Sequence, residues 1–474
     1  MTGPELMVKI TISMSRAFFM SDPDPLLIGR DEYGLLTDLY QLTMSACYIG
    51  EGIDQRRGCF EMFVRHVPDG YGYLIAMGLA QALEYLQHFQ FLPKYFETLR
   101  SSGQFDYAPD SFWDLLANAR FTGDVWAVPE GTAVFANEPF LRVEAPLWQA
   151  QIAETYLLNV LNYQTLVATR SARIRDLAGP DAKLLEFGTR RAFSPQASVW
   201  AARAALAAGF DATSNVIAAL KLGRQPAGTM AHALVMAFTA LEGSEDDAFD
   251  AFQRYFPDAA LLIDTYDTVE AARRLAQRVN RGDMRVPAVR IDSGDLGELA
   301  KVVRSHLPDT KILASGDLDE FEIQRLQQAQ APIAGYGVGT KLVTGTPVNG
   351  VYKLVEIDGF PVMKSSSSKV TYPGRKQIFR HFQGDQLVGD RLGLMTEPAA
   401  PEEMSLLQPV VQAGEIVAPA ESLETIAQRT AKSVASLPKS ARSPRAEATP
   451  PVDISAALQK ITEETRMRLT PAVL

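Results

Sequence analysis

One stretch of the sequence places a histidine beside a bend and the start of a helix. Residues Pro226 to Phe238 read P-A-G-T-M-A-H-A-L-V-M-A-F, which predicts a short strand, a Gly-Thr bend and the first turns of a helix. Ala231, Leu234 and Phe238 recur at three- and four-residue steps and form an apolar stripe. His232 lies one step off this stripe, near the helix N-terminus, where converging backbone N–H groups favour phosphate. Taken alone, the stretch is more typical of a half-buried histidine that a neighbour satisfies.

Similar strand-end motifs recur throughout the second half of the chain. Beyond residue 180, short apolar runs alternate with helical stretches, and polar, charged or glycine residues follow each run. The motifs are Phe187–Arg191, Thr213–Asn215, Gly228–His232, Asp264–Asp267, Arg290–Asp295, Ser315–Asp317 and Gly337–Lys341. Strand-helix alternation predicts a parallel sheet, and six or seven units in roughly 160 residues fit a barrel better than an open sheet. Ligands of such barrels bind at the carboxyl ends of the strands, so these motifs should converge on one rim.

The residue types on this rim suit a phosphorylated, anionic substrate. The glycine amides of residues 337–341, beside a threonine and a lysine, suit a phosphate monoester. Arg190 and Arg290 suit a carboxylate or a phosphate, because a guanidinium binds two oxygens at once. Asp292 and Asp295 suit magnesium on a polyphosphate, or the hydroxyls of a sugar. Each motif alone is more typical of a turn, a capped helix start or a solvated ion pair. Their shared position at the ends of predicted strands is what favours a binding site.

The remaining sequence predicts a second domain around the barrel. Residues 1–30 are rich in Met, Ser and Pro and are expected to form a poorly ordered extension. Residues 31–150 are expected to form an N-terminal α/β domain that residues of about 350–474 complete. The barrel is expected to span residues 151–349.

Local signals predict how the helices before the barrel begin and end. Thr37 is expected to cap the first helix of the N-terminal domain. Three short strands are expected between residues 121 and 144. Two helices, at about 147–163 and 165–177, are then expected to lead into the barrel, the second ending before a Gly-Pro pair.

Composition and charge exclude several classes of protein. The formal net charge of −10 over 474 residues argues against a general nucleic-acid binder. The two cysteines provide neither a disulfide framework nor a four-cysteine metal site, and the five histidines lack metal-ligand spacing. No apolar run approaches the roughly 20 residues that span a bilayer, and the N-terminus lacks the layout of a signal peptide. We therefore expect a cytoplasmic protein.

Six motifs, in unbroken order between about residues 33 and 470, resemble those of nicotinate phosphoribosyltransferases. They are T-D-L-Y-Q-L-T-M at Thr37–Met44, F-G-T-R-R-A at Phe187–Ala192, G-T-M-A-H at Gly228–His232, R-I-D-S-G-D at Arg290–Asp295, G-V-G-T at Gly337–Thr340 and K-V-T-Y-P-G-R-K at Lys369–Lys376. The resemblance implies an irregular α/β barrel joined to a second α/β domain built from both ends of the chain. It also implies transfer of phosphoribose from phosphoribosyl pyrophosphate to nicotinate, which gives nicotinate mononucleotide and pyrophosphate in NAD salvage.

The resemblance implies further partners of the reaction. ATP is a co-substrate, magnesium bridges the phosphates, and the histidine matching His232 carries a transient phosphoryl group. Asp264 is expected to orient the His232 imidazole. Active sites lie at the interface of a homodimer, so Tyr40 would reach the site of the partner subunit.

The resemblance also assigns residues to parts of the substrates. Tyr40 and Phe187 would sandwich the pyridine ring. Arg190, Thr229 and Arg290 would bind or lie near the nicotinate carboxylate, Asp292 would bind the ribose hydroxyls, and Gly316, Gly339 and Thr340 would bind the 5-phosphate.

Ser214 bears on the choice between acid and amide substrates. The related nicotinamide enzyme has an aspartate at the position aligned with Ser214, and a carboxylate there would repel nicotinate. Ser214 therefore favours the acid. Ala233-Leu234 departs from the family, which usually places Ser and a bulkier aromatic residue after the histidine. The alternatives are a nicotinamide-using transferase and a non-catalytic nucleotide-binding relative; a quinolinate-type transferase, which is shorter and lacks the histidine segment, fits less well.

Overall fold

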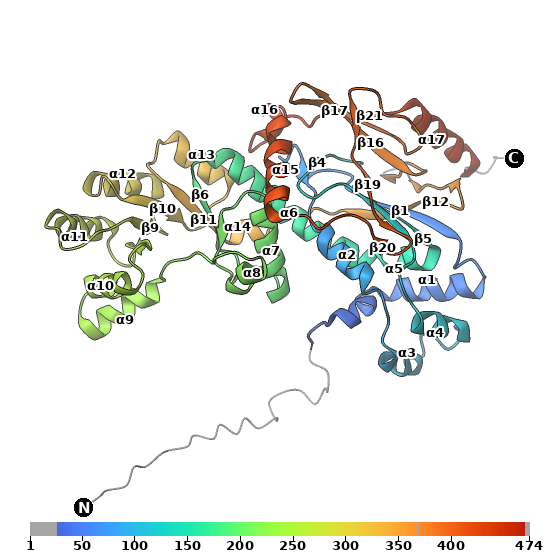
Figure 1. Cartoon of the computed structure of the whole chain (residues 1–474), viewed down its shortest axis with the longest axis horizontal. Coiled ribbons are helices and arrows are strands. Elements are labelled where there is room, and N and C mark those ends of the chain that lie inside the picture. The colour runs from blue at the N-terminus through green and yellow to red at the C-terminus, as the bar shows by residue number, and fades with distance from the viewer. Residues whose placement is uncertain (1–25, 367–368, 470–474) are drawn as a thin grey trace, which may run out of the picture.

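The computed structural model describes residues 26–366 and 369–469. A parallel α/β body and a body of mainly antiparallel sheets lie side by side, with helices α6 (Glu154–Ala178) and α15 (Leu423–Ser436) between them (Figure 1). The predicted N-terminal extension lies outside the described residues up to Pro25, and the 3-10 helix η2 (Arg30–Leu35) follows it. The prediction of an α/β fold is confirmed.

The first body is built on a six-stranded sheet whose paired strands are all parallel. Its strands, in the order β7-β6-β11-β10-β9-β8, are β7 (Ala212–Thr213), β6 (Lys183–Glu186), β11 (Gly335–Val338), β10 (Lys311–Ser315), β9 (Ala288–Ile291) and β8 (Leu261–Leu262). Its helices are α7 (Pro195–Ala207), α8 (Val216–Lys221), α9 (His232–Glu242), α10 (Glu245–Tyr255), α11 (Thr268–Asn280), α12 (Leu296–His306), α13 (Glu320–Gln328) and α14 (Thr340–Val343).

The strand predicted at residues 227–230 is absent, and a coil runs there between the edge strands β7 and β8. The Ala227 N–H donates to the Thr213 carbonyl over 2.9 Å, so the coil touches β7 at one point. On the other side the Arg290 side chain, rather than a ladder of main-chain bonds, reaches the Met230 carbonyl. Pro226 has no N–H to donate, which weakens any ladder at its start. Six paired parallel strands with this coil between the two edge strands are consistent with the expected irregular barrel.

Helix boundaries before the barrel also differ from the prediction. The expected break near residue 164 is absent, because α5 (Leu147–Ile152) ends early and α6 continues for 25 residues from Glu154. The chain is helical and buried at the expected break, where Thr165 Oγ1 donates to the Met77 carbonyl over 3.3 Å. Thr37 is not a cap, since α1 (Leu39–Gly50) follows Asp38 and Thr37 instead bonds to Thr155 over 3.4 Å.

The second body interleaves strands from the two ends of the chain. The seven-stranded sheet, in the order β13-β12-β1-β5-β3-β19-β20, contains β13 (Phe360–Pro361), β12 (Val351–Ile357), β1 (Arg57–Phe63), β5 (Leu141–Pro146), β3 (Asp124–Ala127), β19 (Gln408–Gln412) and β20 (Glu415–Ile416). A four-stranded sheet contains β18 (Glu403–Ser405), β16 (Lys376–Gln383), β17 (Gln386–Leu394) and β21 (Val452–Ile454). Two further two-stranded antiparallel sheets pair β2 (Leu74–Ile75) with β4 (Ala133–Val134) and β14 (Ser365–Ser366) with β15 (Lys369–Val370). The remaining helices are α2 (Leu79–Gln87), η3 (Pro93–Tyr95), α3 (Phe96–Ser101), α4 (Asp110–Ala117), α16 (Lys439–Arg442) and α17 (Ala456–Leu469).

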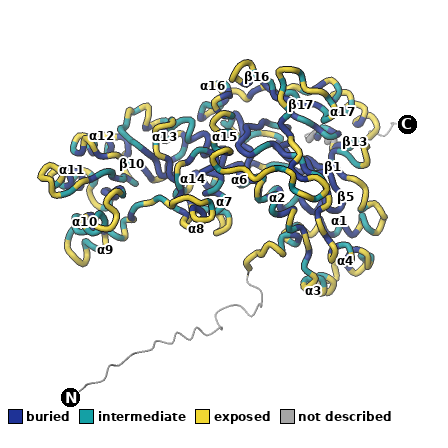
Figure 2. The backbone as a smooth tube through the Cα atoms, in the orientation of Figure 1, coloured by how far each residue is buried: buried dark blue, intermediate teal, exposed yellow. Residues whose placement is uncertain are grey.

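Helix α6 belongs to both hydrophobic cores. Leu157 and Val160, in its first half, pack into the core of the antiparallel body. Val167 and Ala172, further along, pack into the core of the parallel body. Figure 2 shows the buried tube continuing through α6 from one body to the other. Within the described ranges, no helix combines the length and the apolar character needed to cross a membrane.

We predict that the buried pair of Lys376 and Glu61 locks the two antiparallel sheets together. Lys376 Nζ lies 2.7 Å from Glu61 Oε2, and both side chains are at most 2% exposed. Lys376→Met would leave a buried carboxylate unpaired and lower the free energy of unfolding by about 3–5 kcal/mol. The matched control is Lys460→Met, which removes an exposed lysine 3.9 Å from Glu464. Urea unfolding should show a large loss for the first variant and nearly none for the second; equal effects would contradict the prediction.

Candidate active site

The Arg290 guanidinium is the junction of the strand-end rim. From the end of β9, Nη1 donates to Thr229 Oγ1 over 2.6 Å and Nη2 donates to the Met230 carbonyl over 2.9 Å. Its Cζ lies 5.9 Å from the centre of the Phe187 ring at the end of β6. Burial lowers the pKa of Arg290, and the carboxylates of Asp292 and Asp264 oppose that shift. The buried Nε has no hydrogen-bond partner among the described residues.

His232 is the first residue of α9, directly after the coil that Arg290 holds. Its Nδ1 lies 3.1 Å from Thr265 Oγ1. Its Nε2 lies 3.9 Å from Asp264 Oδ1 and 4.0 Å from Asp292 Oδ2, too far for hydrogen bonds but close enough for charge interaction. The side chain remains 39% exposed. The imidazole thus has one nitrogen engaged by a hydroxyl and the other facing two carboxylates.

Asp264 and Asp292 are coupled through the ends of β8 and β9. Asp264 Oδ2 accepts hydrogen bonds from the Asp292 N–H (2.9 Å) and from Ser293 Oγ (2.6 Å). Ser315 Oγ, at the end of β10, donates to Asp292 Oδ1 over 2.5 Å. These bonds leave Asp264 Oδ1, which is buried without a partner, and Asp292 Oδ2 on the side of His232. Two such oxygens suit a hard cation such as magnesium. No group of three or more His, Cys, Asp or Glu side chains in the described ranges could hold a metal alone.

The structure separates Asp292 from Asp295, which the sequence could not distinguish. Asp295 Oδ1 accepts from the Gly297 N–H (3.1 Å) and the Glu298 N–H (3.3 Å), so it caps α12. These backbone bonds lower the pKa of Asp295. Lys341 is likewise engaged, since its Nζ lies 2.9 Å from Asp319 Oδ2. Asp295 is therefore the cap of a helix start, which is the structural role considered for this motif in the sequence.

The glycines expected to bind phosphate permit close approach of neighbouring strand ends. Gly316, after β10, has φ +96°, and a Cβ there would overlap the Asp292 carbonyl. Gly339 precedes the single-turn helix α14, and a Cβ there would lie 3.3 Å from the Phe187 carbonyl. Thr340 is exposed beside it. Backbone from four strands is thus concentrated within a small part of the rim.

A buried carboxylate that sequence reasoning missed supports the turn after β6. Glu186 is fully buried and accepts from the Gly188 N–H and, over 2.5 Å, from Thr213 Oγ1. Burial raises the pKa of Glu186. The Ser214 N–H donates to the Glu186 carbonyl over 2.9 Å, so the same residue also fixes the end of β7. Arg190, further along the turn, is exposed, and no described residue shares a hydrogen bond with it.

Tyr40 lies apart from this cluster within one chain. It is 47% exposed on α1, and its hydroxyl lies 3.4 Å from Glu154 Oε2. A separate cavity of about 400 Å³ is lined by Tyr40 together with Asn162 and Phe193. The expectation that Tyr40 enters a partner's site stays a prediction.

Fold and rim together define a parallel α/β protein whose strand ends present cations, carboxylates and glycine amides to a phosphorylated substrate. Comparison with known proteins specifies the family. A model of the nicotinate phosphoribosyltransferase N-terminal domain matches residues 35–162, and a model of the nicotinate phosphoribosyltransferase family matches residues 182–381.

Individual relatives agree with the family models. The chain is 44% identical over 374 residues to a nicotinate phosphoribosyltransferase of Mycobacterium tuberculosis, covering 76% of this chain and 78% of that protein. It is 42% identical over 384 residues to that of Bacillus subtilis, covering 75% and 76%. The crystal structure of human nicotinic acid phosphoribosyltransferase matches with a TM-score of 0.77 at 28% identity, covering 90% of this chain and 99% of that chain. The chain belongs to the nicotinate phosphoribosyltransferase family, as its motifs indicated.

We predict that Gly316→Ala disturbs the position of Asp292. An alanine at positive φ costs about 1–2 kcal/mol by itself, and here its methyl group would also displace the Asp292 carbonyl. Gly282→Ala is the matched control, because Gly282 has φ +77° with open space around its Cβ position. Thermal unfolding should show a clearly larger loss for Gly316→Ala than for Gly282→Ala. Equal losses would show that the close approach to Asp292 is unimportant.

Proposed function

We propose that the protein transfers phosphoribose from phosphoribosyl pyrophosphate to nicotinate in NAD salvage, with ATP hydrolysis coupled through phosphorylation of His232. The observation that carries the proposal is the environment of His232. Its Nε2 faces two carboxylate oxygens, and it directly follows a coil that Arg290 binds at two points. A partly exposed imidazole nitrogen that faces two carboxylates at the rim is more typical of a functional histidine than of a structural one.

The positions of the cations support an anionic aromatic substrate. No residue in the described ranges accepts a hydrogen bond from the exposed Arg190, so its planar fork is available to the nicotinate carboxylate. Phe187 lies next to Arg290 and offers a face for the pyridine ring. The half-buried Ser214 introduces no negative charge beside the carboxylate, which favours nicotinate over nicotinamide.

The transfer step requires positioning and charge stabilisation more than proton transfer. The pyridine nitrogen donates its lone pair to C1 of the ribose, and the bond from C1 to pyrophosphate breaks with its electrons on the leaving oxygen. The product is a pyridinium nucleotide, and no proton moves. Asp292 would bind the ribose hydroxyls and stabilise the positive charge that develops at C1. Gly316, Gly339 and Thr340 would hold the 5-phosphate through backbone N–H groups and a hydroxyl.

The ATP step assigns a tautomer to His232. If Thr265 Oγ1 accepts the Nδ1 proton, Nε2 keeps the lone pair that attacks the γ-phosphorus of ATP, and ADP leaves with the electrons of the broken P–O bond. Water later cleaves the P–N bond and releases phosphate. Asp264 Oδ1 and Asp292 Oδ2 would hold the magnesium that accompanies the phosphates and neutralises their charge. Thr265 thereby takes the orienting hydrogen bond that the sequence assigned to Asp264.

We predict that His232→Ala uncouples ATP from transfer. The variant should lose ATPase activity and acid-labile phosphate but retain weak, ATP-independent formation of mononucleotide from labelled nicotinate. The control is His88→Ala, because His88 is engaged by the Glu84 carbonyl away from the rim. Normal ATP hydrolysis by His232→Ala would contradict the assigned role.

The same product assay separates the alternatives. Wild-type protein should convert nicotinate in preference to nicotinamide. Turnover of nicotinamide alone would identify a nicotinamide-using transferase, and no turnover of either would identify a non-catalytic relative.

We propose further that the protein is a homodimer with shared sites. Tyr40 and the neighbouring Leu36 and Leu39 are 47%, 37% and 49% exposed, which suits contact with a second subunit. We predict that Tyr40→Ala and His232→Ala, each nearly inactive in ATP-coupled transfer, complement one another when mixed and allowed to exchange subunits. Part of the wild-type rate should return, because one site of each heterodimer is intact. No recovery after proven exchange would place Tyr40 in its own chain's site.

A further inference from the structure

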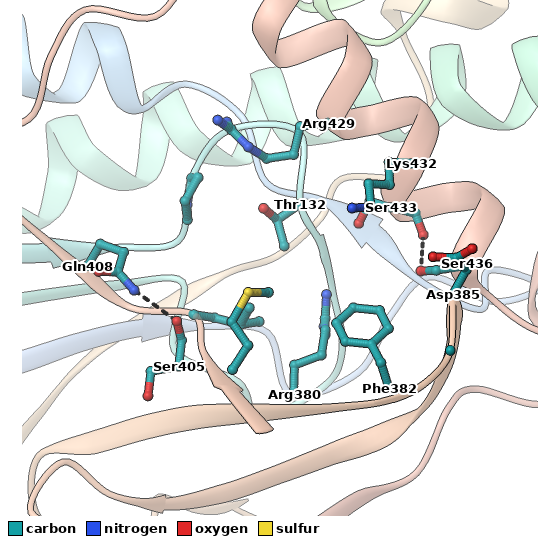
Figure 3. A pocket seen from close by; sticks show the side chains of 14 residues that line it. Thr132, Arg380, Phe382, Asp385, Ser405, Gln408, Arg429, Lys432, Ser433 and Ser436 are labelled. Carbon is teal, nitrogen blue, oxygen red and sulfur yellow. Dashed lines mark hydrogen bonds between the residues drawn. The ribbon is translucent and has the colours of Figure 1, made fainter. Parts of the chain in front are cut away.

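A second cavity lies in the antiparallel body, away from the strand-end rim. It has a volume of about 490 Å³, is open to solvent on one side, and lies between β16, β18 and the helix α15. Its lining side chains come from these elements, from the turn around Thr132, from the turn after β16 that contains Asp385, and from Gln408 of β19 (Figure 3). None of the residues assigned to the proposed reaction lines it. A volume in this range suits a small organic ligand.

The buried Arg380 side chain lines this cavity, and one of its guanidinium nitrogens makes no hydrogen bond to a described residue. Its side chain is 3% exposed, and Nε and Nη2 both donate to Asp390, over 2.9 and 2.6 Å. No described residue accepts a hydrogen bond from Nη1, and Figure 3 shows the guanidinium end turned toward Thr132 across the cavity. Nη1 is not among the fully buried atoms that lack a partner, so it is accessible from the cavity, and a ligand oxygen there could accept a hydrogen bond from it.

Lys432 and Thr132 provide two more free polar groups on the cavity wall. Lys432, on α15, has no carboxylate within ion-pair distance in the described ranges, whereas its neighbour Arg429 is paired with Glu421. The nearly buried Thr132 hydroxyl takes part in no hydrogen bond among the described residues. The cavity is therefore lined by an ammonium group, a guanidinium N–H and a hydroxyl, three kinds of hydrogen-bond donor that suit an anion.

Three carboxylates, those of Asp390, Glu138 and Asp385, bear on the charge of the cavity. Asp390 is neutralised by Arg380. Burial and the neighbouring Asp390 raise the pKa of Glu138 well above its usual range. Asp385 is exposed, where water screens it. Lys432 is exposed as well, so water screens its charge in the same way, and the donors least screened by water are on the buried side chains of Arg380 and Thr132.

The rest of the lining is apolar and partly aromatic. Phe382, from β16, extends into the space beside Arg380, while Met404 and Leu406 line another part of the wall. Thioether sulfur and an aromatic face suit a flat, polarisable ring. Inorganic phosphate is too small and too polar to cover this apolar surface, which would stay in contact with water.

We propose that this cavity binds a mononucleotide, with the phosphate monoester at Lys432, Arg380 and Thr132 and the base against Phe382 and Met404. The proposal does not depend on the reaction at the strand-end rim. The fit follows from an anion that uses three free donors and a ring that covers apolar wall, within a volume too large for phosphate alone.

Calorimetric titration of the full-length protein with AMP tests the proposal. Lys432→Ala should weaken AMP binding about tenfold, or about 1.4 kcal/mol, since it removes the free ammonium. The matched control Lys439→Ala, an exposed lysine outside the lining, should bind as wild type does. Arg290→Ala should also leave this binding in place, because Arg290 lies at the strand-end rim. AMP should bind at least tenfold more tightly than inorganic phosphate.

Three results would overturn the proposal. They are unchanged AMP affinity in Lys432→Ala, loss of binding in Arg290→Ala but not in Lys432→Ala, and equal affinity for phosphate and AMP. A second measurement, photo-crosslinking with an azido-AMP followed by peptide mapping, should label residues 380–385 or 404–408. Labelling confined to residues 226–342 would place the nucleotide at the strand-end rim instead and reject the cavity.

Discussion

The two hydrogen bonds from Arg290 to Thr229 and the Met230 carbonyl hold the site together where the sheet does not. β7 and β8 are the edge strands of the parallel sheet, and main-chain pairing does not join them. A side chain from β9 therefore determines where the coil runs and where α9 begins. This long-range contact positions His232 at the start of α9. A second long-range contact, from Ser293 to Asp264, aligns the carboxylates that face the imidazole.

The elements that could be predicted from the sequence are those whose structure depends on the local pattern of apolar and polar residues. β6, β9 and β10 are apolar runs with polar ends, and α11 and α12 are helices of the kind expected to alternate with such runs. Those strand ends place Phe187, Arg290, Asp292 and Gly316 on one rim, as strand-helix alternation implies. Family membership could also be inferred, because the motifs and their order can be read directly from the sequence without knowledge of the fold.

Features that depend on tertiary contacts could not be predicted from the sequence. Residues 227–230 have strand-like composition, but they form a coil because a side chain, not a neighbouring strand, satisfies Met230. Thr265 was missed because nothing local marks which hydroxyl will meet an imidazole from 33 residues away. Asp292 and Asp295 occur in one motif, yet the start of α12 engages only Asp295. Glu186 looked like part of an apolar run, and its two hydrogen bonds depend on β7 and on the turn that follows it.

The coil at the sheet gap has a consequence for motion. A strand is held by a ladder of main-chain bonds that must break together, whereas this coil has one such bond to β7 and a few side-chain bonds from Arg290. Segments with so few contacts open at much lower free energy than the core that surrounds them. Its amide protons should therefore exchange with solvent as an independent unit, while those of β9 and β10 stay protected. The segment that carries His232 can thus reorganise during a catalytic cycle without any loss of the sheet that supports it.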